Sequence, residues 1–126
     1  MSGEDRIAGL TAEEQLALDR FIAAVRTHYG NRLHEIVLFG SRARGDFHEE
    51  SDVDLAIVLE DGNWEYWDER FILSNLTSDA LMDDGLFIQP MLVASSDWRA
   101  RERPWIRNAH RDGRPVLKCA SQGQTP

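Results

Sequence analysis

The residues best suited to chemistry are Asp52 and Asp54, which open an apolar run that ends at Leu59. Such a run is typical of a buried strand, in which residues i and i+2 point to the same side with their Cα atoms about 6.6 Å apart. Two carboxylates held together beside an apolar core repel each other unless a cation lies between them. Mg²⁺ prefers carboxylate oxygens, and one or two such ions suit this pair. The spacing therefore predicts a divalent metal site at Asp52 and Asp54.

A Gly-Ser pair is the second feature with chemical potential. Ile36–Phe39 is predicted to be a short buried strand, and Gly40 and Ser41 come directly after it. Glycine permits close approach of another backbone, while Ser41 offers a hydroxyl and an N–H to a phosphate. If Ser41 begins a short helix, the free N–H groups there also favour an anion. One strand end would then hold phosphate and its neighbour metal, which is the minimum apparatus for phosphoryl or nucleotidyl transfer.

Each of these features has a structural alternative when it stands alone. A Gly-Ser pair is commonly a plain turn, and an Asp-x-Asp is commonly a solvated strand end. The two together, at fixed spacing between two buried-strand patterns, favour function. Arg42 and Arg44 either clamp phosphates or are solvated turn residues that balance the nearby acids. His48 lies in the same turn and is a weaker catalytic candidate.

The sequence Gly40-Ser41-Arg42-Ala43-Arg44-Gly45, followed by Ser51-Asp52-Val53-Asp54-Leu55, resembles the signature of the DNA polymerase beta-like nucleotidyltransferase superfamily. The short chain resembles its minimal nucleotidyltransferase (MNT) branch. The resemblance implies transfer of a nucleoside monophosphate, AMP from ATP, to an acceptor hydroxyl. It also implies that Asp52 and Asp54 bind Mg²⁺ and that Gly40 and Ser41 contact the triphosphate. The candidate nucleotide-binding residues are accordingly Gly40, Ser41, Arg42, Arg44 and Ser51.

The same resemblance implies a protein partner. Minimal members of the superfamily often pair with a small helical toxin of the HEPN ribonuclease type, and some act as antitoxins by adenylylating it. The acceptor hydroxyl is then expected on such a partner. The alternative is a catalytically weak or inactive antitoxin that binds and neutralises a HEPN-type toxin without modifying it.

One departure from the superfamily pattern bears on activity. Active members usually place a third carboxylate on a later strand, where it helps to bind metal and to activate the attacking hydroxyl. The matching segment here, Leu86–Val93, contains no acid, and Gln89 is its only polar side chain. Three explanations stay open: another acid fills the role, the base is supplied differently, or the protein binds nucleotide with little turnover.

The elements that must position these residues follow from local patterns. Thr11 and Glu14 have the spacing of a capping box, and they predict a helix that Gly30 ends. Residues 41–50 are expected to form a turn or a single helical turn. A further helix is predicted from about Trp64, since Trp64, Trp67 and Phe71 lie at helical spacing. The two Trp are interpreted as core residues, with an exposed partner-binding pair as the alternative.

The later part of the chain completes the predicted fold. Residues 83–85 are expected to be a loop, and the strand 86–93 should lie at an edge or a bulge because it contains Pro90. A last helix is predicted from Pro104 to Arg111, with Gly113 beyond its end. The resulting fold class is α/β (α+β), a small mixed β-sheet packed with helices. Residues 1–119 are expected to form a single domain, with 120–126 as a disordered tail.

Composition limits the classes of partner. The net charge is −8, which divides into −13 for residues 1–98 and +5 for residues 99–126. The acidic part should repel nucleic acid, so the basic segment or a metal must hold an anionic substrate. The Arg residues from 99 to 114 are either a solvated face or a contact for a polyanion or acidic partner. The chain has a polar start and a single cysteine, Cys119, and it contains no apolar run near 20 residues. These features predict a cytoplasmic protein with no membrane contact.

Overall fold

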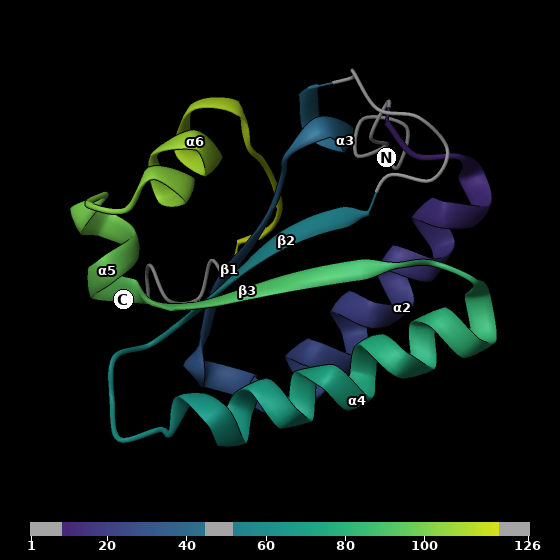
Figure 1. The fold of residues 1–126 in the computed structure, drawn as a ribbon. Coiled ribbons are helices and arrows are strands. Elements are labelled where there is room, and N and C mark those ends of the chain that lie inside the picture. The colour runs from purple at the N-terminus through teal and green to yellow at the C-terminus, as the bar shows by residue number, and fades with distance from the viewer. Residues whose placement is uncertain (1–8, 45–51, 119–126) are drawn as a thin grey trace.

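A single mixed β-sheet organises the part of the chain that the computed structural model describes, residues 9–44 and 52–118. The sheet order is β3-β2-β1-β4, with β2 antiparallel to β1 and parallel to β3 (Figure 1). This confirms the predicted fold class. The elements in chain order are α2 (Ala12–Tyr29), a 3-10 turn (Gly30–Arg32), β1 (Leu33–Phe39), α3 (Ser41–Arg44), β2 (Val53–Leu59), α4 (Tyr66–Asp84), β3 (Ile88–Ala94), α5 (Ser95–Ala100), α6 (Pro104–Asp112) and β4 (Arg114–Lys118).

Helix α2 begins as its capping box predicts. The Glu14 N–H donates to Thr11 Oγ1 at 3.0 Å, and the Thr11 N–H donates to Glu14 Oε1 at 3.0 Å. These bonds satisfy N–H groups that a helix start otherwise leaves without partners. The helix ends before Gly30, whose φ of +56° suits glycine. The capping box therefore fixes where this helix starts relative to the sheet.

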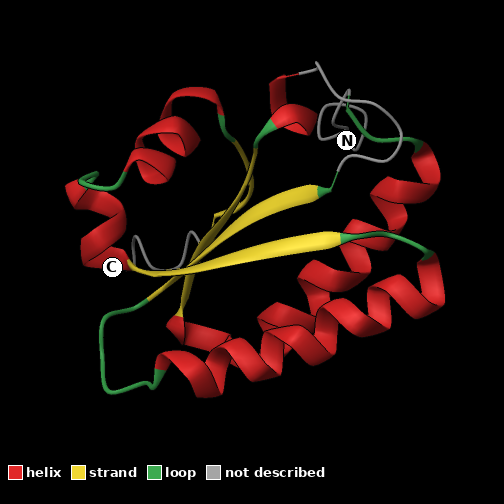
Figure 2. Ribbon diagram, in the orientation of Figure 1, coloured by secondary structure: helices red, strands yellow, loops and turns green. Residues whose placement is uncertain are grey.

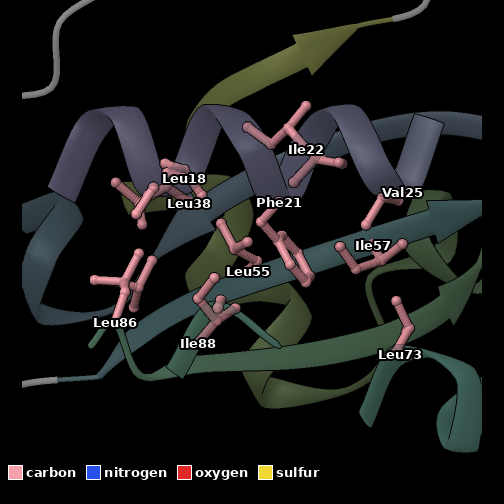
Figure 3. Packing of buried hydrophobic residues seen from close by; sticks show 14 of the residues in the cluster. Leu18, Phe21, Ile22, Val25, Leu38, Leu55, Ile57, Leu73, Leu86 and Ile88 are labelled. Carbon is pink, nitrogen blue, oxygen red and sulfur yellow. The ribbon is translucent and has the colours of Figure 1, made fainter. Parts of the chain in front are cut away.

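The helices cover both faces of the sheet (Figure 2). Helices α2 and α4 lie on one face, where Leu18, Phe21 and Leu73 pack against Leu55 and Ile57 (Figure 3). Helices α5 and α6 lie on the other face, where their buried side chains pack against three strands. Strand β2 is buried from both sides, which explains why its sequence is apolar almost throughout. The residues of the second cluster are Val37, Ala56, Val58, Val93, Trp98, Ile106 and Ala109.

Helix α4 differs from its prediction in two respects. It continues to Asp84 and ends at Gly85, whose left-handed φ of +71° closes the helix. The loop predicted at residues 83–85 is therefore wrong for Asp83 and Asp84. The core interpretation is also wrong for Trp67, which is 71% exposed, whereas Trp64 is partly buried against the core. Helical spacing alone did not reveal which side of α4 faces the sheet.

One predicted feature of the sheet is confirmed, and two elements were missed by the sequence patterns. Pro90 lies in β3, which is an edge strand of the described sheet, as the missing N–H of proline requires. Strand β4 and helix α5 were not predicted, because both are short and carry little periodicity. None of the helices in residues 9–44 and 52–118 is long and apolar enough to cross a membrane. The predicted tail at 120–126 lies outside the described residues.

Candidate active site

The two aspartates lie at the start of β2. Asp52 immediately precedes the strand and is exposed, while Asp54 is its second residue and is partly buried. Desolvation raises the pKa of the Asp54 carboxyl above its ordinary value, the nearby charge of Asp52 raises it further, and Arg44 opposes both effects. The ionised pair is therefore unfavourable when no cation is bound, as the spacing predicts.

The Gly-Ser turn directly contacts this carboxyl. Strands β1 and β2 pair so that Phe39 lies opposite Asp54, and Gly40 is the first residue after β1. Gly40 has a φ of +80°, and a Cβ at this position would lie 2.3 Å from Asp54 Oδ2. No side chain fits between this backbone and the carboxylate, so the position requires glycine for both conformation and space. The structure thus brings together the two features that the sequence suggested for phosphate and metal.

The side chain of Arg42 is buried and hydrogen-bonded within the protein. This residue belongs to the single helical turn α3, and its side chain is 3% exposed. Its guanidinium donates to both Glu14 oxygens, at 2.8 and 3.3 Å, and to the Gly9 carbonyl at 3.0 Å. Partial burial alone would raise the pKa of Glu14, but hydrogen bonds from Arg42 and Thr11 outweigh it and hold the pKa below its usual value. Arg42 is therefore not a solvated turn residue; it joins α3 to the start of α2.

Arg44 lies at the other end of α3 and is exposed. Its charge lowers the pKa of Asp54 on β2 and also that of Asp112 at the end of α6. For Asp112 the larger influence is the hydrogen bond from Arg111. Arg44 is therefore near both the aspartate pair and the last turn of α6. Of the two arginines in the turn, only Arg44 combines exposure with electrostatic contact to the candidate metal ligands.

Gln89 lies on the strand where the superfamily pattern has a third carboxylate. In the parallel pairing of β2 with β3, Gln89 is the register partner of Asp54, and its side chain is exposed. Partners in register lie on the same face of a sheet, so the neutral amide of Gln89 is on the face that carries the Asp54 carboxyl. Across residues 9–44 and 52–118, acids and other metal-binding side chains do not gather in groups of three or more.

The donor set nevertheless fits a divalent cation of the magnesium type. Such ions are commonly held by one or two protein carboxylates, with substrate phosphates and water completing the coordination. Asp52 and Asp54 supply two carboxylates, and burial, followed by the charge of Asp52, raises the pKa of Asp54. The backbone of Gly40 lies against the Asp54 carboxylate. Of the other sequence candidates, Ser51, Gly45 and His48 lie outside the described residues.

Sequence reasoning missed two residues that belong to this arrangement. Glu14 was identified only as a helix cap, although it also binds Arg42 and so holds the turn that carries Gly40 and Ser41. Asp112 received no role, although it lies in electrostatic contact with Arg44. Both contacts join segments far apart in the chain, and no local spacing encodes them.

The comparison with known families agrees with this geometry. The sequence profile described as "Nucleotidyltransferase domain" matches residues 18–88, which include the Gly-Ser turn, the aspartate pair and all of α4. The chain belongs to the nucleotidyltransferase family. It is also 34% identical over 103 residues to the "putative protein adenylyltransferase MJ0604" of Methanocaldococcus jannaschii, covering 80% of this chain and 95% of that protein. The predicted resemblance is thereby confirmed, and the chain is a nucleotidyltransferase enzyme.

Solved structures support the same fold for this nucleotidyltransferase. A "putative nucleotidyltransferase" from Sulfolobus solfataricus superimposes with a TM-score of 0.59 at 18% identity, covering 82% of this chain and 78% of the other. A chain from the complex of tri-AMPylated Shewanella oneidensis HEPN toxin with MNT antitoxin gives a TM-score of 0.52 at 18% identity, covering 86% and 75%. At such low identity these likenesses establish the fold and nothing finer.

Proposed function

We propose that this nucleotidyltransferase transfers AMP from ATP to a hydroxyl group of a partner protein, with Asp52 and Asp54 as ligands of Mg²⁺. The observation that carries the proposal is the contact between Gly40 and Asp54, where a Cβ would lie 2.3 Å from the carboxylate oxygen. Because Gly40 carries no side chain and its backbone lies against the Asp54 carboxylate, a triphosphate bound at the turn would lie beside the proposed metal ligands. The name of the Methanocaldococcus jannaschii relative supports adenylyl transfer to protein.

Each residue of the turn has a distinct part in the proposed site. The Gly40 backbone admits the triphosphate, and Ser41, together with Ser51, donates hydrogen bonds to its oxygens. Arg44 supplies positive charge near the phosphates, because it is the exposed arginine beside Asp54. Arg42 acts indirectly by holding α3 against α2. Bound Mg²⁺ would neutralise charge that develops on the phosphate oxygens.

The proposed reaction is a displacement at the α-phosphorus of ATP. The acceptor oxygen forms a new P–O bond, the bond between the α- and β-phosphates breaks, and pyrophosphate leaves with the electron pair. The hydroxyl proton must pass to a base or to solvent, and the Gln89 amide beside Asp54 cannot accept it. We therefore expect a slower reaction than in a site with a carboxylate at this position.

The proposed partner is a helical protein of the HEPN type that bears the acceptor hydroxyl. The complex of AMPylated HEPN toxin with MNT antitoxin, whose chain has a similar fold, supports this choice. A second function, neutralising such a toxin by binding alone, is favoured specifically by Gln89 in the register position of Asp54.

Label transfer separates the two functions. The chain is co-expressed with the product of the adjacent gene, and the purified complex receives ATP labelled at the α-phosphate, with Mg²⁺ or with a chelator. Label on the partner that requires both Mg²⁺ and an intact Asp54 is the expected result, with Asp54→Asn as the control. A stable complex that acquires no label would establish the binding function instead. Label that persists in Asp54→Asn would refute the assignment of the metal ligands.

A further inference from the structure

The first half of α4 carries an aromatic surface that the active site does not use. Trp67 and Phe71 are 71% and 67% exposed, and Tyr66 is 42% exposed. The rings of Tyr66 and Trp67 meet edge to face with centroids 5.0 Å apart. A shallow surface pocket lies at the same place and is lined by Trp67, Arg70, Phe71 and Ser74. We call Tyr66, Trp67 and Phe71 the α4 aromatic patch. Exposed aromatic side chains in such density are typical of binding surfaces.

The charges around the patch restrict what can bind there. Residues 60–84 contain eight acids and a single base, Arg70. Among these acids, Glu69 contacts Arg32, Asp84 contacts Arg20 and Glu60 contacts His34, while Glu65 and Asp68 beside the patch are exposed. This environment repels nucleic acid and anionic membrane surfaces. It favours a protein surface on which basic side chains surround apolar ones.

A second copy of this chain does not provide such a surface. If two α4 patches met face to face, the acids of residues 60–84 would approach one another across the contact. Half of the Lys and Arg residues of the chain, seven of fourteen, lie in residues 99–118, which carry a net positive charge. The large exposed apolar side chains of the described residues are Leu16, Tyr66, Trp67, Phe71, Met82 and Phe87, and none of them lies in that basic segment. The basic surface of a second copy therefore offers no apolar counterpart to Trp67 and Phe71.

We propose that the α4 aromatic patch is a docking surface for an amphipathic helix of another protein, whose apolar stripe is flanked by Lys or Arg. Trp67 and Phe71, one helical turn apart, match the spacing of apolar residues on such a helix. The patch follows the end of β2, whereas Asp54 is near the beginning of this strand, about 17 Å from its end. The bound protein can therefore be held without covering the nucleotide site. The proposal specifies the contact surface of the partner in the proposed function and rests on that function only for the existence of a partner.

Photo-crosslinking in the source cells identifies what contacts the patch. Trp67→p-benzoylphenylalanine places the probe in the patch, and Met82→p-benzoylphenylalanine is the matched control, because Met82 is 81% exposed on the same helix, about 20 Å along its axis. We expect position 67 to crosslink to a helical segment of another protein with at least two basic residues beside its apolar stripe. Crosslinks to this chain, to an acidic or non-helical segment, or at no higher level than from position 82 would overturn the proposal.

Binding of the purified crosslinked protein then tests the energetics. The double change Trp67→Ala with Phe71→Ala should weaken its Kd at least tenfold, as expected for two central aromatic contacts. Met82→Ala should leave the Kd within twofold, and Asp68→Lys should weaken it most at low salt. An unchanged Kd in the double variant would overturn the proposal. Asp54→Asn should bind the partner normally, and the double variant should keep its thermal stabilisation by Mg²⁺-ATP, so failure of the docking surface and failure of the proposed catalytic site give different results.

Discussion

The charge of Asp54 should affect the stability of the folded protein in a way that depends on pH. Desolvation and the neighbouring Asp52 raise the pKa of Asp54 above the ordinary value, and Arg44 only partly compensates. When a carboxyl has a higher pKa in the folded protein than in the unfolded chain, its contribution to stability is fully present below the unfolded pKa. This contribution is lost as the pH rises through the folded pKa. The metal-free protein should therefore carry a stability cost at neutral pH that bound metal removes.

The variant Asp54→Asn tests this cost. It keeps the shape of the side chain and removes its charge, so without metal it should be as stable as the parent at pH 7, or more stable by up to about 1 kcal/mol. The advantage should diminish as the pH falls toward 4, where the parent carboxyl takes up its proton. The variant should also lose the stabilisation that Mg²⁺-ATP gives the parent by mass action.

Melting curves of both proteins, with and without Mg²⁺-ATP across this pH range, provide the measurement. If Asp54 instead satisfied buried backbone donors, its neutralisation would cost about 1–3 kcal/mol. A variant that melts well below the parent and still responds to Mg²⁺-ATP would therefore contradict its assignment as a metal ligand.

Gln89 gives the second residue-scale prediction. Because it is the register partner of Asp54, Gln89→Asp would place a third carboxylate on the same face of the sheet. Mg²⁺ should then bind more tightly, and transfer to the partner should increase. Titration calorimetry with Mg²⁺ and the label-transfer rate measure the two effects. Gln89→Glu is a useful comparison because its longer side chain keeps the charge and changes the reach. If neither binding nor transfer changes in Gln89→Asp, the third-acid interpretation of this strand is wrong.

At the scale of elements, the turn that carries the candidate phosphate site is too short to hold itself in place. Helix α3 has four residues, fewer than an isolated helix needs for stability. Its position depends on the contact of Arg42 with Glu14 and the Gly9 carbonyl, at the start of α2. Because Glu14 also forms the capping box, the same side chain begins α2 and anchors α3. The helix before β1 is therefore part of the support of the active site.

Arg42→Ala and Arg44→Ala should distinguish the residue that holds α3 in place from the residue that contacts the nucleotide. The loss of hydrogen bonds from a buried guanidinium to a carboxylate should lower the free energy of unfolding of Arg42→Ala by about 1.5–3 kcal/mol. Arg44→Ala should change it by less than about 0.5 kcal/mol, as at ordinary surface positions, while weakening Mg²⁺-ATP binding. Urea unfolding and nucleotide titration measure both quantities. Equal loss of stability in the two variants would contradict the distinction.

The pH dependence of Arg42→Ala provides an independent check. The pKa of Glu14 is lowered in the folded protein, so its stabilisation is present above the unfolded value of about 4.5 and is lost as the pH falls through the folded pKa. In the parent, acid should therefore remove part of the stability that Arg42 supports. The difference in unfolding free energy between parent and Arg42→Ala should shrink between pH 5 and pH 3. A difference that stays constant over this range would mean that Glu14 is not the partner that matters.

At the scale of the whole molecule, the charge asymmetry of the sequence becomes an asymmetry between the two faces of the sheet. Helix α4, on one face, carries five acids and one Arg. Residues 95–112, which include α5 and α6 on the other face, carry five Arg and three acids. Helix α4 and the pair α5 and α6 lie on opposite sides of the sheet (Figure 1). One side therefore carries an acidic helix with exposed aromatic rings, and the other carries mildly basic helices.

This arrangement predicts that nucleic acid is not the acceptor. Fluorescence anisotropy with labelled single-stranded RNA and DNA should show no binding tighter than about 10 µM at physiological salt, because the net charge of −8 opposes it. Measurements at low salt are the sensitive control, since a basic surface would bind more tightly there. Tight binding whose affinity falls steeply with salt would contradict the prediction and would direct attention to the Arg residues of α6.

The sequence by itself determined the features that local rules encode. The capping box of α2, the buried strands β1 and β2, and the edge position of Pro90 follow from hydrogen-bonding groups or apolar runs within a few residues. The chemistry of the site was also accessible, since the Gly-Ser turn and the aspartate pair lie within one short segment. Family membership could be inferred from that segment for the same reason.

Tertiary structure decided which side of each element faces the core and which distant residues meet. Trp67 has the spacing of a core residue, but the sheet contacts the opposite side of α4, so the ring is exposed. Arg42 and Arg44 are two residues apart and equivalent by pattern, yet only Arg42 points to the start of α2 and is buried. The pairing of Gln89 with Asp54 depends on strand register, which is fixed by packing over the whole sheet. These contacts join residues far apart in the chain, and their energies depend on geometry that no local spacing specifies.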